Sequence, residues 1–345
     1  MTQTASQNRR CVLAERPHGT PTVQSFRLDV EPIPTAGRGQ MLLRTLFLSL
    51  DPYMRGRMSD APSYAPPVAV GATMLGGTIA EVVASNLAGF APGDTVLGTS
   101  GWQDYALSDG SGITNLGSNP QNPSWALGVL GMPGFTGWAA LREIGRPQPG
   151  ETLVVAAATG PVGATVGQIA SLWGCKTIGI AGGPEKCAFA TKTLGFGICL
   201  DHRAGDFAAQ LKAATPNGID IYFENVGGKV FDAVLPLLNP HARIPVCGVV
   251  SQYNATSLPE GPDRLPLLMS TILRKKLTVR GFIIFDDFAA LFPEFRQQMQ
   301  AWIAAGKIHY REDVTDGLEN APAAFLRMLS GESFGKSVVR VGLAT

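Results

Sequence analysis

The sequence has little that would hold a secreted protein together covalently. Its five cysteines are an odd number, widely scattered along 345 residues, and none forms a C-x-x-C pair or a cluster with histidine. This pattern excludes a disulfide framework and a structural zinc site. The polar N-terminus, MTQTASQNRRC, has no apolar run of the kind that a secretory signal contains. We therefore expect a cytoplasmic protein whose thiols are free and buried.

The sequence also has no marked excess of charge of either sign. The formal net charge is +1 and no basic block occurs, which argues against nucleic acid as the main partner. No charged residue occurs between Glu151 and Lys176. Although an uncharged run of this length is compatible with a membrane span, glycines and a proline interrupt it and no cationic flank anchors it. We therefore expect neither a nucleic acid nor a membrane as partner.

The uncharged stretch has the pattern of a phosphate-binding turn. The apolar run TLVV is followed by AAATGPVGATVGQIA, so a β-branched strand ends in small residues and opens into a glycine-spaced helix. Such a turn brings backbone N–H groups against a dinucleotide pyrophosphate, with Gly160, Gly163 and Gly167 allowing close approach and packing. The G-x-G-x-x-G pattern is imperfect because Ala158 stands at its first position. Taken alone, the glycines fit an ordinary tight turn between a strand and a helix equally well.

The first part of the chain is rich in short strands, turns and prolines. This composition predicts a β-rich, barrel-like unit. The clearest expected strands are 41–50, 76–85 and 93–100.

The pattern changes near Thr152, where apolar strands begin to alternate with helical segments. That alternation predicts a parallel sheet covered by helices on both faces. Its last expected strand is 277–284, followed by one helix over 286–306, and the chain then continues as a strand over 307–313, a helix and a final strand.

Two domains follow from the length and from this change of pattern. The closing tail is too short to fold alone, so we expect it to return to the first domain. The predicted division is a domain of residues 1–130 with 307–345, and a second domain of residues 131–306.

Several motifs span nearly the whole chain and point to a known family. They are LSLDPYMRGRMSD (48–60), GMPGFTGW (131–138), AATGPVGATVGQIA (157–170), YFENVGG (222–228), VCGVVSQYN (246–254), RGFII (280–284), ENAPAAF (319–325) and FGK (334–336). With these motifs in the family's order, the chain resembles the zinc-independent medium-chain dehydrogenase/reductases. Within them it resembles the leukotriene hydroxydehydrogenase/prostaglandin reductase branch. The resemblance implies an α/β fold, with a GroES-like β-rich catalytic domain and an inserted Rossmann domain with a doubly wound parallel sheet.

The activity that the resemblance implies is NADPH-dependent reduction of the carbon–carbon double bond of α,β-unsaturated ketones, without a metal. The substrate would be a small hydrophobic enone, and a homodimer is common among such relatives. Two alternatives remain at this point: an NADPH quinone oxidoreductase, and a nucleotide-binding protein without turnover.

The preference for NADPH over NADH depends on the end of the second strand of the Rossmann domain. A site for NAD would place a carboxylate there, but this strand ends in Gly182 and Gly183. Glu185 follows in the first turn of the next expected helix, where an acidic side chain is favourable to the helix dipole. Lys186 corresponds to the family's partner of the 2′-phosphate. Gly183 and His202 replace the family's serine and tyrosine, and His202 either donates to the phosphate or caps a loop.

Other residues are expected to line the cofactor. Asn225 and Gly248 follow parallel strands at their carboxyl ends, where a doubly wound sheet binds ligands, although Asn225 also suits a turn. By resemblance, Met132 and Thr136 face the nicotinamide, and a C-terminal lysine, Lys336, contacts the cofactor. The complete predicted set is Met132, Thr136, Gly160, Pro161, Val162, Gly163, Gly182, Lys186, His202, Asn225, Gly248, Val249, Phe282, Ile283, Ile284 and Lys336, where Phe282 to Ile284 form an apolar wall or a plain core strand.

Tyr53, Tyr64 and Tyr253 are the aromatic candidates for a substrate pocket. Each also suits a packing role with its hydroxyl at the surface. Tyr253 and Tyr53 are the predicted catalytic hydrogen-bond donors, because hydride addition to an enone needs a donor at the developing enolate oxygen. The four histidines are scattered, and the stretch SLDPYMR stands where the wider superfamily places its first zinc ligand, so we expect no metal.

Overall fold

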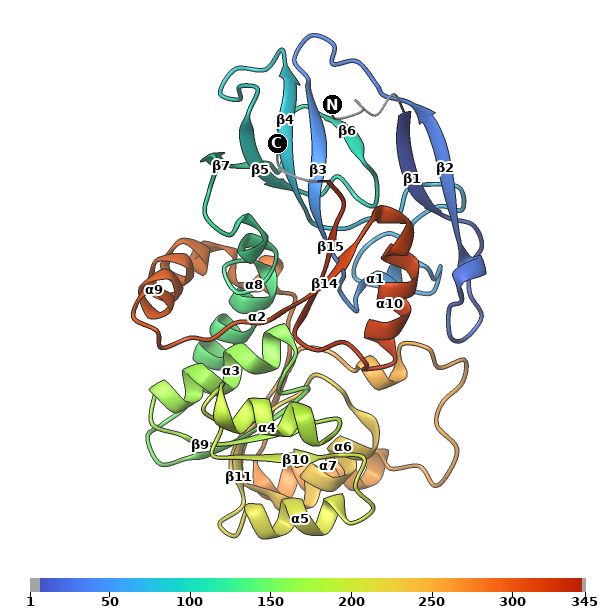
Figure 1. Ribbon diagram of the computed structural model, residues 1–345. Coiled ribbons are helices and arrows are strands. Elements are labelled where there is room, and N and C mark those ends of the chain that lie inside the picture. The colour runs from blue at the N-terminus through green and yellow to red at the C-terminus, as the bar shows by residue number, and fades with distance from the viewer. Residues whose placement is uncertain (1–6, 343–345) are drawn as a thin grey trace. The chain divides into compact units, whose positions relative to one another are not determined.

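The computed structural model describes residues 7–342 and divides into two compact units (Figure 1). Unit 1 comprises residues 1–127 and 312–345, and unit 2 comprises residues 128–311. Residues 1–6, part of the polar N-terminus in which we expect no signal, lie outside the described residues, as do residues 343–345. Within the described chain, no helix has the length and apolar character that crossing a membrane requires.

Unit 1 is built mainly from strands. A separate antiparallel pair consists of β1 (Gln7–Leu13) and β2 (Phe26–Pro32). The main seven-stranded sheet has the order β14 (Glu312–Asp316), β15 (Lys336–Arg340), β3 (Met41–Ser49), β4 (Thr78–Ser85), β5 (Asp94–Gly98) and β7 (Thr114–Ser118), with β6 (Tyr105–Ser108) also paired to β3. Its described helices include α1 (Met54–Arg57) and α10 (Ala321–Leu329).

The C-terminal tail completes the main sheet of unit 1. Strand β15 pairs antiparallel with β3, Val338 opposite Ser49, and β14 pairs parallel with β15. In the core of unit 1, the buried indole of Trp102 stacks on the ring of Phe26, with 5.5 Å between ring centres. It also meets the ring of Phe325 of α10 edge-on, with 5.6 Å between centres. The tail therefore supplies both strands and core side chains to the first 127 residues of the chain.

Unit 2 contains a six-stranded parallel sheet. The order is β10 (Ile198–Asp201), β9 (Lys176–Ala181), β8 (Thr152–Ala156), β11 (Ile219–Phe223), β12 (Leu238–Val246) and β13 (Thr278–Gly281). Numbered within the unit, this order is 3-2-1-4-5-6, that of a doubly wound dinucleotide-binding fold. The longer helices are α2 (Met132–Ala140), α3 (Pro161–Leu172), α4 (Pro184–Lys192), α5 (Phe207–Ala214), α6 (Gly228–Val234), α7 (Leu265–Lys275) and α9 (Phe292–Ala304).

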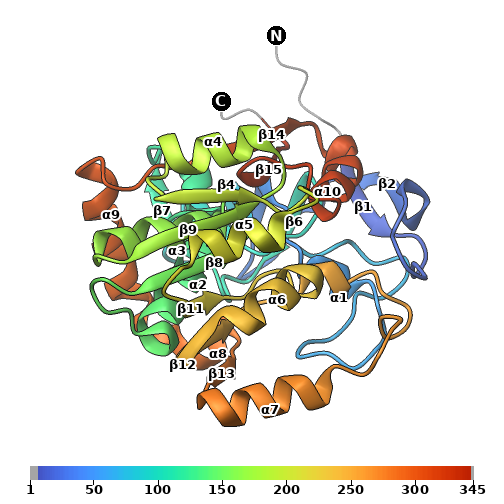
Figure 2. The ribbon, with the colours of Figure 1, turned by 90° about the horizontal axis from the view of Figure 1, so that it is seen from below.

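Helices cover both faces of this sheet (Figure 2). On one face, Val154 and Ile180 pack in a cluster with Leu211 of α5, Val234 of α6 and Ile272 of α7. Helix α3 lies against β8 and β9, and α4 lies against β9 and β10. Every residue of β8 is buried, as expected for a central strand covered on both sides.

Three predicted elements are corrected by the structure. The strand expected to reach residue 284 ends at Gly281, and Ile284 instead begins the short helix α8 (Ile284–Phe288). The single helix expected over 286–306 is divided into α8, the 3-10 turn Ala289–Leu291 and α9, which begins at Phe292 with Pro293 in its first turn, where a missing N–H costs nothing. The strand expected over 307–313 begins only at Glu312.

Candidate functional site

The turn between β8 and α3 lies at the carboxyl edge of the parallel sheet. Ala157 adopts a left-handed backbone conformation, with φ of 53°. Gly160 precedes the helix with extended backbone and no side-chain cap, and Pro161 is the first helical residue, followed by half-buried Val162. A Cβ on Gly163 would lie 2.3 Å from the Ala157 carbonyl oxygen. The first amides of α3 are thus left for an anion, and only glycine fits at position 163.

A cluster of cationic side chains lies beside the end of β9. A Cβ on Gly182 would lie 3.0 Å from Nε of Arg203 and 3.1 Å from Nε2 of His202, so both side chains lie against this glycine. Gly183, with φ of 95°, donates its backbone N–H to Oδ1 of Asp201 at 2.9 Å. The same carboxylate oxygen accepts the Arg203 N–H at 2.9 Å, which holds the loop after β10 in place.

The electrostatics of this cluster suit a bound anion. Burial lowers the pKa of His202, and the positive charges of Arg203 and Lys186 lower it further, while Asp201 opposes them. Lys186 therefore lies within electrostatic reach of His202, although the two residues come from different segments. A phosphate placed among these groups would be stabilised by all of them, and it would favour protonated His202. Arg203 was not predicted from the sequence, where the only signal is the basic pair that follows β10.

The segment after β11 is tied to β8 at the same edge of the sheet. Asn225 donates from Nδ2 to the Ala156 carbonyl at 2.9 Å. Oε1 of the buried Glu224 accepts the N–H groups of Val226 at 2.6 Å and Gly227 at 2.8 Å. Burial raises the pKa of Glu224, and these backbone donors oppose that effect. The sequence did not single out Glu224, whose carboxylate shapes the loop that carries Asn225.

Tyr253 lies in the loop that follows β12. A Cβ on Gly248 would lie 2.9 Å from the Tyr253 hydroxyl, so this hydroxyl faces the Gly248 backbone. The ring is half-buried, directly after the short helix Val250–Gln252. A Cβ on Gly227 would lie 3.4 Å from the side chain of Val249, so the two residues are packed closely. The loop thus places the Tyr253 hydroxyl and closely packed backbone at the carboxyl edge of the sheet, where doubly wound sheets bind ligands.

The remaining predicted cofactor residues of unit 2 lie in α2 and around the start of α8. Met132 begins α2, and buried Thr136 donates its hydroxyl to the Met132 carbonyl at 2.8 Å. Phe282 packs against the ring of Phe288, half-buried Ile283 precedes α8, and Ile284 is buried in that helix. The segment from Phe282 to Ile284 is apolar, as predicted, but it is not a strand.

Two of the tyrosines of unit 1, Tyr53 and Tyr64, are the substrate-pocket candidates, and both lie near Arg57. The Arg57 guanidinium lies 4.3 Å from the centre of the Tyr64 ring, which is 59% exposed. Tyr53 is half-buried and packs against the core of unit 1. Burial, together with the charge of Asp51, raises the pKa of Tyr53. Its hydroxyl therefore keeps its proton across the physiological range and stays a hydrogen-bond donor.

Lys336 lies in the core of unit 1. Its ammonium donates to the Leu50 carbonyl and to Oδ1 of Asp51, each at 2.8 Å, and the side chain is 1% exposed. Asp51 also accepts the Ser49 hydroxyl. Two of the three N–H groups of Lys336 are thus used inside the unit, and the buried ion pair is by itself a reason for a lysine here.

Comparison with known proteins agrees with these observations. Two family models match, one described as the N-terminal domain of oxidoreductase over residues 9–116 and one as zinc-binding dehydrogenase over residues 161–304. The NADPH-dependent curcumin reductase of Escherichia coli K12 is 63% identical over 99% of both chains. Mouse prostaglandin reductase 1 is 38% identical over 93% of this chain and 95% of its own.

The structural comparison extends this likeness to the fold. CurA from Vibrio vulnificus, solved in complex with NADPH, has a TM-score of 0.96 and 60% identity over 97% of this chain and 100% of its own. The chain belongs to the prostaglandin reductase branch of the zinc-independent medium-chain dehydrogenase/reductases. The predicted family and the predicted α/β fold are therefore confirmed.

The metal ligands of the wider superfamily have no counterpart in the part of this reductase that the structure describes. Among residues 7–342, no three histidine, cysteine, aspartate or glutamate side chains form a group that could hold a metal ion.

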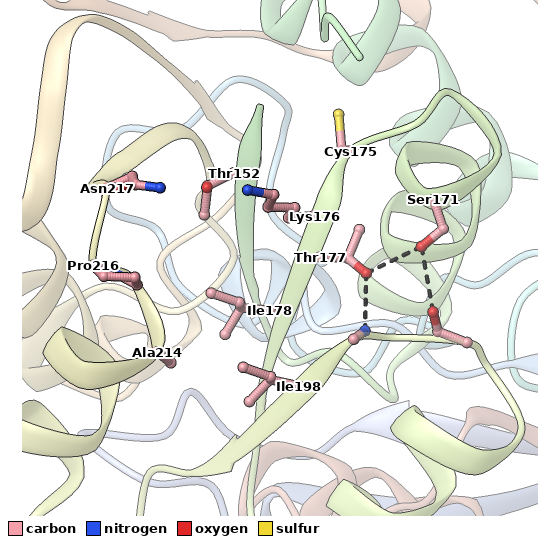
Figure 3. Close-up of a pocket in the computed structure, with 12 residues that line it drawn as sticks. Thr152, Ser171, Cys175, Lys176, Thr177, Ile178, Ile198, Ala214, Pro216 and Asn217 are labelled. Atoms are coloured by element: carbon pink, nitrogen blue, oxygen red, sulfur yellow. Dashed lines mark hydrogen bonds between the residues drawn. The ribbon is translucent and has the colours of Figure 1, made fainter. Parts of the chain in front are cut away.

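A separate cavity of about 530 Å³ lies at the opposite edge of the reductase's parallel sheet (Figure 3). Thr152, Lys176 and Ile198, the first residues of β8, β9 and β10, line it. In its wall, the Ser171 and Thr177 hydroxyls are hydrogen-bonded at 3.0 Å. Because the phosphate turn lies at the carboxyl ends of these strands, this cavity is not the cofactor site.

Proposed function

We propose that the protein reduces the carbon–carbon double bond of α,β-unsaturated ketones with NADPH. The observation that carries the choice of cofactor is the cluster of Lys186, His202 and Arg203 beside Gly182, which suits a 2′-phosphate. The choice of reaction is supported by relatives of high identity that are named curcumin reductase and prostaglandin reductase. The substrate is a small hydrophobic enone.

The chain's own groups hold the cofactor and stabilise charge. The Gly160–Gly163 turn binds the pyrophosphate through the N-terminal amides of α3, and Lys186 with its cationic neighbours binds the 2′-phosphate. When bound, NADPH supplies the hydride that adds to the β-carbon of the enone. Tyr253 donates a hydrogen bond to the carbonyl oxygen, on which negative charge develops, and Tyr53 is the alternative donor. A phenol that keeps its proton, as Tyr53 does, suits that role.

Steady-state oxidation of NADPH tests this function. With a panel of enones and quinones, we expect turnover of enones that exceeds both the quinone rate and the rate without substrate. Turnover of quinones alone would contradict the proposal and favour a quinone oxidoreductase. Nucleotide binding without turnover of any enone would contradict it as well.

Replacing Lys186 with alanine should weaken NADPH binding and leave NADH binding nearly unchanged. Only the 2′-phosphate makes the charge-assisted contact that this change removes, and its loss should cost roughly 1.5–3 kcal/mol, about one to two decades in affinity. The measurement is the dissociation constant of each cofactor. Arg203→Ala should act in the same sense, and Lys192→Ala, in the last turn of the same helix, is the matched control. Equal weakening of both cofactors would make Lys186 a structural residue.

We also propose that the enzyme is cytoplasmic and forms a homodimer through the outer strand of unit 2. The cytoplasmic assignment rests on its free thiols. Helix α7 exposes more than half of Leu265, Met269 and Leu273, which are spaced at four residues and so share one face. Beside them, β13 forms the edge of the sheet with all its residues exposed. A second copy covers both features at once, because a twofold axis pairs each β13 edge with its counterpart.

The proposed dimer predicts that charged substitutions at its interface reduce the size of the enzyme in solution. Replacing both Leu273 and Val279 with glutamate adds carboxylates of one sign to the surface that each copy buries, so their repulsion and desolvation should make the double variant elute as a monomer. Size-exclusion chromatography with light scattering measures this. The variant Leu107→Glu, at an exposed leucine of β6, should remain dimeric. A monomeric wild-type enzyme would overturn the proposal.

A further inference from the structure

Two half-buried cysteines meet inside unit 2. Cys187 lies in the N-terminal part of α4, and Cys199 lies in β10. The Cys199 thiol donates to the Cys187 sulfur at 3.0 Å, and the two residues are 12 apart in the sequence. An S–S bond is about 2.05 Å long, so the two sulfurs need to approach by only roughly 1 Å when oxidation joins them.

The pair joins the two segments that form the cationic cluster. Cys187 directly follows Lys186, and Cys199 precedes Asp201, His202 and Arg203 in the chain. The Asp201 carboxylate already connects these segments through the Gly183 N–H. A bond between the sulfurs would therefore act on the part of the molecule that distinguishes NADPH from NADH.

We propose that Cys187 and Cys199 form a reversible disulfide when a peroxide oxidises the enzyme, and that this bond weakens the binding of NADPH. The Cys187 thiolate attacks the peroxide, cleaves its O–O bond and becomes a sulfenic acid while water leaves. The Cys199 sulfur then attacks the sulfenic sulfur, and a second water leaves as the S–S bond forms. In sum, two thiols and one hydrogen peroxide give one disulfide and two waters, and the two sulfurs lose two electrons.

Local chemistry makes Cys187 the attacking residue. The hydrogen bond from Cys199 lowers the pKa of Cys187, although burial outweighs it and raises that pKa overall. Burial raises the pKa of Cys199 as well, and the negative charge of Asp201 adds to the rise for both thiols. Only the small thiolate fraction of Cys187 attacks the peroxide, so the reduced pair is stable in a reducing compartment and its oxidation needs an excess of peroxide.

The effect on the cofactor follows from the displacement that the bond requires. Closing the sulfur contact draws the first turns of α4 and the end of β10 together, so Lys186 shifts relative to His202 and Arg203. Contacts to a phosphate depend on the separation of these groups, whereas NADH lacks the 2′-phosphate that they would bind. This consequence rests on the proposed phosphate site, while formation of the bond does not.

The experiment uses full-length enzyme treated with hydrogen peroxide. We expect the free thiols of the denatured protein to fall from five to three, and peptide mass mapping to join Cys187 to Cys199. The NADPH KM should rise by about tenfold, the NADH KM should stay constant, and dithiothreitol should reverse both changes. Cys187→Ser and Cys199→Ser should abolish the effect, and Cys175→Ser, a matched control at another half-buried cysteine, should retain it.

Three results would overturn the inference: absence of the bond, a bond between other cysteines, or a bond that leaves the NADPH KM unchanged. An equal rise of both KM values would exclude selective action at the phosphate site. Failure of the phosphate site itself is recognised separately, because Lys186→Ala in the reduced enzyme would then weaken both cofactors equally. Cys187→Ala and Cys199→Ala serve as second variants if either serine variant is unstable.

Discussion

Replacing Tyr253 with phenylalanine should lower kcat by about tenfold to a thousandfold, with little change in NADPH affinity. The change keeps the ring and removes only the hydroxyl, which in this structure faces the Gly248 backbone. An interaction made mainly in the transition state lowers kcat and kcat/KM together when it is removed. Steady-state kinetics with a saturating enone, together with the dissociation constant of NADPH, measures both quantities.

Two further variants define the role of the hydroxyl. Tyr105→Phe, on β6 of unit 1, is a conservative control and should retain full kcat. Tyr53→Phe should lower kcat if Tyr53 shares the donor role. A Tyr253→Phe enzyme with unchanged kcat and a raised KM would make Tyr253 a wall of the substrate pocket, and the donor role would pass to Tyr53.

Replacing Asp51 with alanine should give the largest loss of stability. Lys336 would then keep its charge in the core without a carboxylate partner, and breaking such a buried pair costs roughly 3–5 kcal/mol. For a unit of this size, we expect the melting temperature to fall by about 10 °C. Differential scanning calorimetry of the cofactor-free enzyme measures it.

The double variant Asp51→Leu/Lys336→Met separates the pair from its surroundings. Apolar residues at both positions leave no buried charge, so the double variant should melt closer to wild type than Asp51→Ala. A fall in melting temperature as large as that of Asp51→Ala would contradict this account. The predicted contact of Lys336 with NADPH needs its third N–H, so the double variant, which lacks that N–H but holds no unpaired charge, should have a raised NADPH KM.

The sequence predicted secondary-structure elements correctly where the local periodicity of apolar residues agrees with their packing in the fold. Strand β8 is apolar throughout because helices cover both of its faces, and glycine spacing marked the turn into α3. Helix α7 was not predicted, although its apolar residues follow a helical period and several of them face outward. The interruption between α8 and α9 is a single 3-10 turn, Ala289–Leu291, inside a pattern that is otherwise helical.

Site residues were predictable when a motif or a strand end marked them. Arg203 was not predicted, since its position against Gly182 depends on the course of the loop after β10. Asp51 and Lys336 are 285 residues apart, so no local pattern indicates that they pair. The contact of Cys187 with Cys199 likewise exists only after α4 has packed beside β10.

The return of the C-terminal tail to unit 1 has a consequence for synthesis on the ribosome. Unit 2 is continuous in the chain, so all of its strands have been made by the time residue 311 is added. One side of strand β3 must wait for β15, because the partner residues Val338 to Arg340 are translated after the whole of unit 2. Until then Asp51 also lacks Lys336. The half of the protein that begins first along the messenger is therefore the half that is completed last.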